Sequence, residues 1–256
     1  MSDLREVFDV GGEVRLEVQL RSADVRIKKG ESGKVAVRVS GPEDSVGRVD
    51  IDASTTGVAI REHPGGRRWS EGTIDVTVNL PHGSDVSIRV GGGDIRVGTS
   101  VNDLDINVGS GDVRVGDADG VVHVNVASGD VNAGELGGEA EVNSASGDVR
   151  IASARNLKVG SASGDLLLGE LTGSGRITSA SGDVRISSFS GSDLSISSMS
   201  GDALIGLISG MRVDADIKTL SGSLINQITP SDTEARGAMR LAIKSLSGDV
   251  ILTSAK

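Results

Sequence analysis

The sequence contains no cysteine and no tyrosine, and its only aromatic residues are Phe8, Trp69 and Phe189. The lack of cysteine excludes disulfides, thiolate metal ligands and cysteine nucleophiles. Its three histidines are too few and too scattered to form a histidine-based metal site. A core without aromatic side chains must be filled by Val, Ile, Leu and Ala, which predicts a thin core between many short strands.

Positive charge and long apolar runs are also scarce. The chain has 26 Lys and Arg against 36 Asp and Glu, a formal net charge of −10, which argues against the basic surface of a nucleic-acid-binding protein. No apolar run approaches the ~18 residues of a membrane span, and no signal-peptide pattern is found at the N-terminus. We therefore expect a cytoplasmic protein with no nucleic-acid partner and no membrane span.

Glycine, in contrast, is abundant at 37 residues, and some of these glycines mark a repeat. The motif Ser-Gly-Asp, usually preceded by Ala, recurs every 17 to 19 residues, with gaps of 21 and 26 at the end. Its glycine positions are Gly93, Gly111, Gly129, Gly147, Gly164, Gly182, Gly201, Gly222 and Gly248. Such phase-locked spacing indicates a repeat architecture, and the longer final gaps predict loop insertions.

Apolar residues alternate around each repeat glycine and predict two β-strands per repeat. One apolar column lies five residues before the glycine, as at Ile106 and Val124, and two more lie two and four residues after it, as at Val149 and Ile151. Strict alternation is the period of a strand with one buried face. A shorter apolar column, seven residues after the glycine, leaves open a third strand in each repeat.

A period near 18 residues fits one turn of a parallel β-solenoid. A propeller blade needs about 40 residues, and an immunoglobulin sandwich has no such period. In a solenoid, equivalent residues of successive turns stack about 4.8 Å apart, which accounts for the recurrence of Asn107, Asn125 and Asn143. We predict an all-β, single-stranded parallel β-helix with about nine turns from Val86 to the C-terminus.

The first 80 residues follow a different pattern. Residues 16–27 read as one more turn of the repeat, and four alternating segments follow it, joined by loops that contain Pro42 and Pro64. An uncovered solenoid end is an unpaired strand edge. We therefore expect residues 1–80 to form a β turn and a β-meander cap, continuous with the solenoid repeats of residues 81–256.

With its Ala-Ser-Gly-Asp-Val-Arg-Ile repeats, the chain resembles the bacterial putative-adhesin β-strand repeat family, also called the toastrack domain. Residues 81–256 carry the repeats. The resemblance implies a right-handed parallel β-helix without enzymatic activity, of a kind often attached to membrane proteins of envelope-stress systems. Those membrane-linked forms carry a membrane span and an export signal, and neither pattern is found in this sequence.

An acidic column directly follows the repeat glycines. It includes Asp112, Asp130, Asp148, Asp165 and Asp183. In one interpretation these residues are metal ligands of a calcium- or ligand-binding β-roll, whose ligands are Asp and carbonyl oxygens at tight turns. In the other, each Asp accepts hydrogen bonds from turn amides and pairs with an Arg two residues later. The second half of each turn lacks the β-roll glycines, so we favour the structural interpretation and expect no cofactor.

Catalysis is not expected from these columns. Polysaccharide-cleaving enzymes also use β-helices, but their chemistry needs an isolated acidic cluster and usually aromatic platforms for the sugar. In the repeat region, Phe189 is the one aromatic residue, and it lies in a column that is otherwise apolar.

The column three residues after the repeat glycine faces outward and changes along the chain. Early turns carry mainly arginine there, whereas later turns carry Leu167, Leu204, Ile225 and Ile251. The corner column, two residues before the glycine, grows from alanine to methionine and leucine over the same turns. An exposed apolar stripe on a soluble protein indicates an interaction surface, unless a late loop such as residues 228–239 folds over it.

Trp69, beside two arginines, is a further candidate, because its surroundings have the composition of an interface hot spot. The alternative is a tryptophan packed onto the core of the cap. Together these residues predict a non-enzymatic interaction scaffold that binds itself, as a homo-oligomer, or a protein partner through its C-terminal apolar face.

Overall fold

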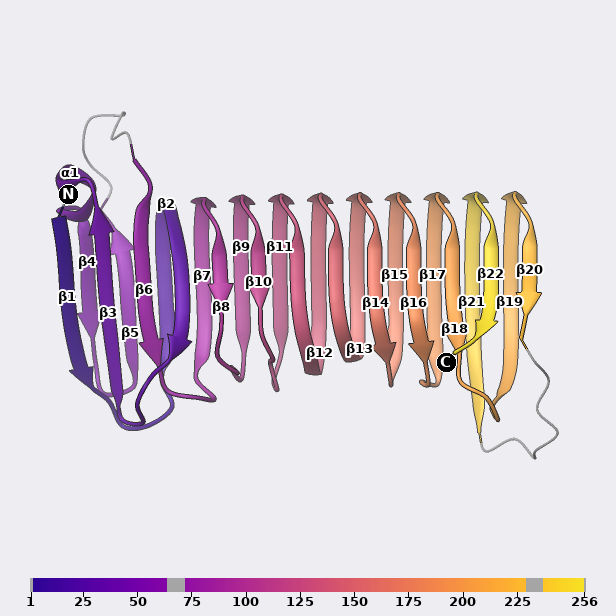
Figure 1. The fold of residues 1–256 in the computed structure, drawn as a ribbon, viewed down its shortest axis with the longest axis horizontal. Helices are drawn as coiled ribbons and strands as arrows, with labels where there is room; N and C mark the ends of the chain where they lie inside the picture. The colour runs from indigo at the N-terminus through magenta and orange to yellow at the C-terminus, as the bar shows by residue number, and fades with distance from the viewer. Residues whose placement is uncertain (1, 64–71, 229–236, 256) are drawn as a thin grey trace. The chain divides into compact units, whose positions relative to one another are not determined.

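The computed structural model describes residues 2–63, 72–228 and 237–255, and these residues form 22 strands and one short helix (Figure 1). The predicted all-β fold is confirmed. The chain divides into two compact units, Met1–Gly129 and Asp130–Lys256.

The first unit contains the short helix α1 (Glu43–Val46), which lies between β3 and β4 in the chain. Its strands are β1 (Ser2–Asp9), β2 (Arg15–Lys29), β3 (Lys34–Gly41), β4 (Val49–Ala53), β5 (Gly57–Glu62), β6 (Ile74–Leu80), β7 (Asp85–Gly92), β8 (Ile95–Val97), β9 (Leu104–Ser110), β10 (Val113–Val115) and β11 (Val122–Ser128). The strands of the second unit are β12 (Val131–Ser146), β13 (Val149–Ser163), β14 (Leu166–Leu171), β15 (Ser174–Ser181), β16 (Val184–Phe189), β17 (Asp193–Ser200), β18 (Ala203–Leu207), β19 (Arg212–Ser221), β20 (Leu224–Gln227), β21 (Ala238–Ser247) and β22 (Val250–Ser254).

The repeats of the first unit stack in parallel and in register. Ile106 of β9 lies opposite Ile88 of β7 on one side and Val124 of β11 on the other. Val113 of β10 lies opposite Ile95 of β8. Each repeat thus adds one strand to each of two parallel ladders, and the inward-facing side chains of these columns are buried between them. The predicted alignment of residues about 18 apart is confirmed here.

Strand β2 is a full turn of the repeat, as the sequence predicts, because its two halves pair in parallel with β7 and β8. On its other side β2 pairs in parallel with β5 and β6. Strand β3 is antiparallel to β6 and to β1, and β4 is antiparallel to β5. The cap is therefore a meander only in its outer strands, while β5 and β6 prolong the parallel ladders. Alternation predicts a strand but not its direction, so the sequence could not show this.

An ion pair also links the outer strand of the cap to β3, beside the backbone pairing of the two strands. Arg38 of β3 donates to Asp3 of β1 at 3.0 Å, and Arg5 donates to the same carboxylate at 2.8 Å. The hydrogen bonds from Arg5 and from Arg38 lower the pKa of Asp3 below its ordinary value.

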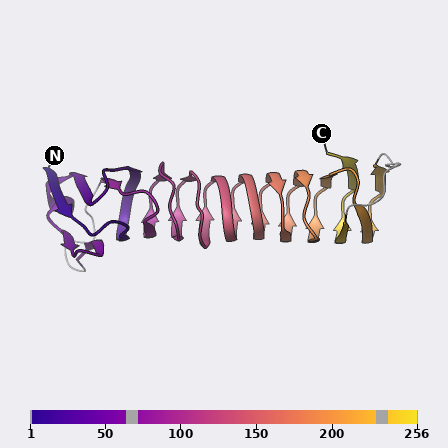
Figure 2. The same cartoon turned by 90° about the horizontal axis from the view of Figure 1, so that it is seen from below.

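In the second unit, β12 and β13 each span a full turn, and the two ladders lie in two layers (Figure 2). Leu166 of β14 lies opposite Val149 of β13 and Val184 of β16. The third apolar column forms no separate strand in the described part of this unit. Leu171 and Phe189 are buried at the ends of β14 and β16 instead, so they prolong the second strand of each repeat.

The last repeat departs from the order of the sequence. Strand β21 pairs with β17 on one side and with β19 on the other, and β22 lies between β18 and β20 (Figure 1). The repeat of Gly248 is thus inserted between those of Gly201 and Gly222. The expectation that consecutive repeats are spatial neighbours is wrong for these turns, and β19 and β20 end the two ladders.

One inward column of the second unit is polar. Three residues before the repeat glycine, the first unit has the buried valines Val90, Val108 and Val126. The second unit has serines, and the buried hydroxyls with no hydrogen-bond partner among the described residues include those of Ser144, Ser161, Ser179 and Ser245. Burying such a hydroxyl costs roughly 1–3 kcal/mol, so each of these turns gains less from this column than a valine turn does.

Each corner requires glycine for its conformation and for its contacts. Gly164 has φ +121°, and a Cβ there would lie 2.2 Å from the carbonyl oxygen of Gly147 in the neighbouring turn. Gly210 also has a positive φ, +81°, but a Cβ there would meet nothing within 4 Å. A side chain at position 164 would therefore meet both backbone strain and a steric clash, whereas one at position 210 would meet backbone strain alone.

We predict that Gly164→Ala lowers the free energy of unfolding by roughly 3 kcal/mol or more, because strain and a backbone clash combine. The matched variant Gly210→Ala should cost only about 1 kcal/mol, since it adds strain alone. Urea unfolding followed by circular dichroism measures both. Equal losses would contradict the tight stacking of the corners.

Candidate interaction surface

The aspartates that follow the repeat glycines link successive turns by hydrogen bonds. In the first unit, the backbone N–H of Asp94 donates to Oδ1 of Asp24 at 2.9 Å, and that of Asp112 donates to Oδ1 of Asp94 at 3.1 Å. In the second unit the same bond, 2.8–3.0 Å long, joins the pairs Asp148–Asp130, Asp165–Asp148, Asp183–Asp165, Asp202–Asp183 and Asp249–Asp202. Each carboxylate therefore accepts the corner amide of the neighbouring turn.

Several of these carboxylates also pair with an arginine two residues later, as the structural interpretation predicts. Arg114 donates to Oδ2 of Asp112 at 3.1 Å, and Arg150 donates to Oδ2 of Asp148 at 2.7 Å. Arg185 makes the same contact with Asp183 at 3.2 Å. Among the described residues, no group of three or more His, Cys, Asp or Glu side chains is arranged to hold a metal ion.

The chain of aspartates ends at Ser223, which occupies the aspartate position after Gly222. Its backbone N–H donates to Oδ1 of Asp249 at 2.8 Å. Strands β19 and β20 are the last of their ladders, so no further turn within the described residues needs a carboxylate at position 223. This serine, which breaks the aspartate column, is the signal in the sequence that marks the end turn.

Three of the predicted interface residues lie side by side on the outer face of the second unit. Ile251 of β22 lies opposite Leu204 of β18 and Ile225 of β20. We call these three residues the apolar column. Leu167 is separated from Leu204 by Arg185, although both leucines line one shallow pocket of about 480 Å³. Trp69 lies outside the described residues.

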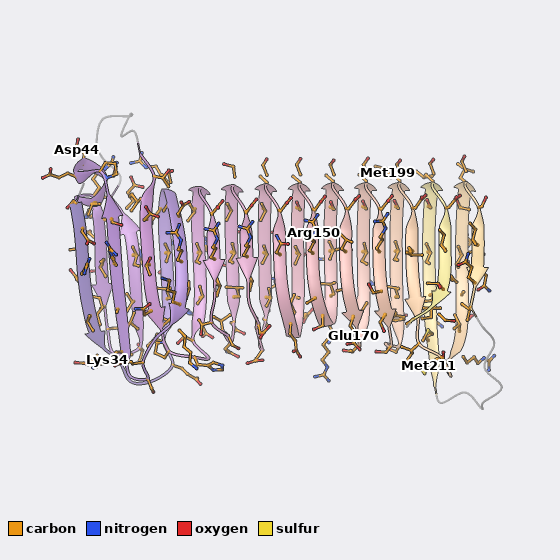
Figure 3. All side chains as sticks on the ribbon, viewed as in Figure 1. Lys34, Asp44, Arg150, Glu170, Met199 and Met211 are labelled. Atoms are coloured by element: carbon orange, nitrogen blue, oxygen red, sulfur yellow. The ribbon has the colours of Figure 1, made fainter. Side chains whose placement is uncertain are left out.

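A second apolar row runs along the corner of the same turns. It consists of Met199, Leu246 and Leu220, whose exposed fractions are 55%, 51% and 82%. The strand registers place Leu246 between the other two, and Met199 is labelled in Figure 3. We call this row the corner ridge, and the column and the ridge together the C-terminal apolar surface.

The end turn also exposes part of the core. Leu224 of β20 lies opposite the fully buried Val250, yet Leu224 is 51% exposed. In the described part of the second unit, the exposed large hydrophobic residues are Met199, Leu220, Leu224, Ile225 and Leu246. They all belong to the last three turns. Of the late loop expected as a possible cover, residues 229–236 lie outside the described residues.

A pocket of about 400 Å³ on the outer face of the first unit is lined by polar side chains that include Glu17, Asp103, Asp105 and His123. Its carboxylates already have partners. Asp103 accepts the backbone N–H of Val121 at 2.8 Å, and Asp105 pairs with Arg89 at 2.8 Å. These contacts are those of a solvated, ion-paired sheet face. The C-terminal apolar surface is therefore the stronger candidate.

We predict that Asp165→Asn is tolerated, because the amide Oδ1 can still accept the N–H of Asp183, whereas Asp165→Ala lowers the free energy of unfolding by about 1–3 kcal/mol. Asp165 suits this test because the residue two positions later is Leu167 rather than an arginine. Urea unfolding compares the variants. Similar losses of unfolding free energy for the two variants would show that the charge of Asp165, rather than its hydrogen bond, stabilises the fold.

The model of the Toastrack DUF4097 family matches residues 14–253 of the chain. Among solved structures, a putative adhesin from Bacteroides fragilis is 12% identical, with 98% of this chain and 97% of that chain covered and a TM-score of 0.40. A putative lipid binding protein from Parabacteroides distasonis is 10% identical, with 98% and 96% covered and a TM-score of 0.45. No curated protein matches the chain. Within the described residues, no helix has the length and apolarity needed to cross a membrane.

Proposed function

Because the chain belongs to the Toastrack DUF4097 family, we propose that it is a non-enzymatic scaffold that binds protein through its C-terminal apolar surface. In this proposal the repeats wind as a right-handed parallel β-helix. The parallel, in-register ladders support the helix, and connections between parallel strands of one sheet are right-handed in nearly all proteins, which supports the hand.

The observation that carries the proposal is the confinement of exposed apolar residues to one end of the second unit. The apolar column and the corner ridge follow the same three turns, on the two sides of the polar corner that each turn makes at its repeat glycine. Earlier turns of this unit carry Asn132, Arg150, Leu167 and Arg185 in the column, of which only Leu167 is apolar, and alanines in the ridge. A soluble protein gains nothing from such a surface unless another molecule covers it.

The use of the acidic residues supports a non-enzymatic role. General acid–base chemistry needs carboxylates with free oxygen atoms and separated pKa values. The repeat aspartates instead accept backbone amides, and several also pair with arginine. Their regular recurrence marks them as part of the framework.

We predict that Leu204→Asp combined with Ile225→Asp abolishes binding at this surface. Each apolar side chain buried in a contact contributes roughly 2 kcal/mol, so the double variant should weaken association by about 1000-fold. If the protein associates with itself, multi-angle light scattering will show the variant as a monomer. If it binds another chain, the variant will lose the cross-linked partner that the wild type retains.

Asn132→Asp combined with Thr178→Asp is the matched control, because it adds the same charge at outward positions away from the surface. It should behave as the wild type. A double variant of Leu204 and Ile225 that keeps both its mass and its cross-linked partner would contradict the proposed function.

A further inference from the structure

The end turn, formed by β19, β20 and the corner that joins them, presents two strand edges beside core side chains that no other described residue covers. Within the described residues, β19 pairs only with β21, and β20 only with β22. Ile217 is partly exposed on the inward side of β19, and Leu224 is 51% exposed on β20. A free strand edge is a template for a further strand, and the apolar side chains here favour one that also covers the core.

We propose that the end turn binds the end turn of a second copy of this chain, by antiparallel pairing of the two β19 strands. The proposal rests on the proposed function, since it names a partner for the C-terminal part of the molecule. It adds a contact of its own, because the strand edge is distinct from the outward-facing apolar column.

The corner of the end turn argues against a parallel continuation of the ladders. At the inner corners, an aspartate accepts the amide of the next turn, but the end turn has Ser223 at that position. A further parallel turn would therefore find no carboxylate to accept its corner amide, and the shorter serine side chain reaches less far toward it. Antiparallel pairing along β19 makes no demand on the corner, so it is compatible with a serine there.

The charge of the end turn suits contact between two identical surfaces. Strand β19 carries two basic and two acidic residues, and β20 carries none. The end turn is therefore neutral in a chain with a formal net charge of −10. Two copies can bring these ends together without the repulsion that their other acidic surfaces would cause.

The order of these charges selects a register. The outward side of β19 presents Arg212, Asp214, Asp216 and Lys218 in sequence. If two antiparallel strands were centred on Ala215, Arg212 would face Lys218 and Asp214 would face Asp216, which are like charges. If they are centred on Ile217, Asp216 of each copy faces Lys218 of the other. Opposite charges across an antiparallel pair are stabilising and like charges are destabilising, so we assign the register centred on Ile217.

Charge reversal tests this pairing by sedimentation equilibrium at low salt. Asp216→Lys and Lys218→Asp each place like charges opposite one another twice in the dimer, so each variant should associate about tenfold or more weakly than the wild type. The combined variant Asp216→Lys plus Lys218→Asp should restore the dimer. An equimolar mixture of the two single variants should also form a heterodimer, because both of its cross-strand pairs are then complementary.

Arg176→Asp is the matched control. It reverses one charge on the outer face of β15, which is separated from β19 by β17 and β21, and it should leave the dimer intact. Lys218 also pairs with Asp216 of its own strand at 3.1 Å, and the combined variant restores that contact as well. Association in the mixture, where that contact stays broken in both chains, is therefore what excludes misfolding as the cause of any loss. A wild type that is monomeric, or variants that dimerise as the wild type does, would overturn the proposal. Loss of association in the Leu204 and Ile225 variant alone would leave the proposed function standing while rejecting the β19 contact.

Discussion

The architecture of each unit depends on the need of every corner amide for an acceptor. A glycine with positive φ turns the chain at each corner, and its neighbour in the adjacent turn lies too close for a Cβ. The next residue's N–H then points at the adjacent turn, where the aspartate Oδ1 receives it at 2.8–3.1 Å. The corner aspartate thus donates its N–H to one neighbouring turn and accepts the N–H of the other neighbour with Oδ1. Each turn therefore fixes the register of the next, and the aliphatic columns stack as a consequence.

The same constraint explains why the interaction surface lies at the end of the second unit. The inserted repeat of β21 and β22 carries Asp249 at its corner. The backbone N–H of Asp249 donates to Oδ1 of Asp202 on one side, and Oδ1 of Asp249 accepts the N–H of Ser223 on the other. It also places Ile251 between Leu204 and Ile225, and Leu246 between Met199 and Leu220. Both apolar rows are therefore continuous only because the last repeat is inserted. Sequence order would still have grouped these residues, but with different neighbours and a different end turn.

Periodicity was sufficient to predict the strands, the in-register stacking, the extra turn at β2 and the outward position of the late apolar residues. It could not predict strand direction in the cap, since β5 and β6 alternate like β3 but run parallel to β2. It also missed the insertion of the last repeat, because every repeat presents similar edges. Two residues did carry that information. Ser223 replaces the aspartate, and Asn226 stands where other turns have a buried aliphatic residue, which suits a turn with solvent on one side.

Engineered disulfides test the stacking order most directly, since the chain has no cysteine of its own. Ser197 lies opposite Lys244, and Lys244 lies opposite Lys218. We predict that Ser197→Cys with Lys244→Cys oxidises to an intramolecular disulfide, because neighbouring strands are about 4.8 Å apart. Ser197→Cys with Lys218→Cys should keep its thiols within the monomer free, because about 10 Å exceeds the span of a disulfide. A disulfide within the second pair, and none in the first, would contradict the inserted repeat and the end turn that it creates.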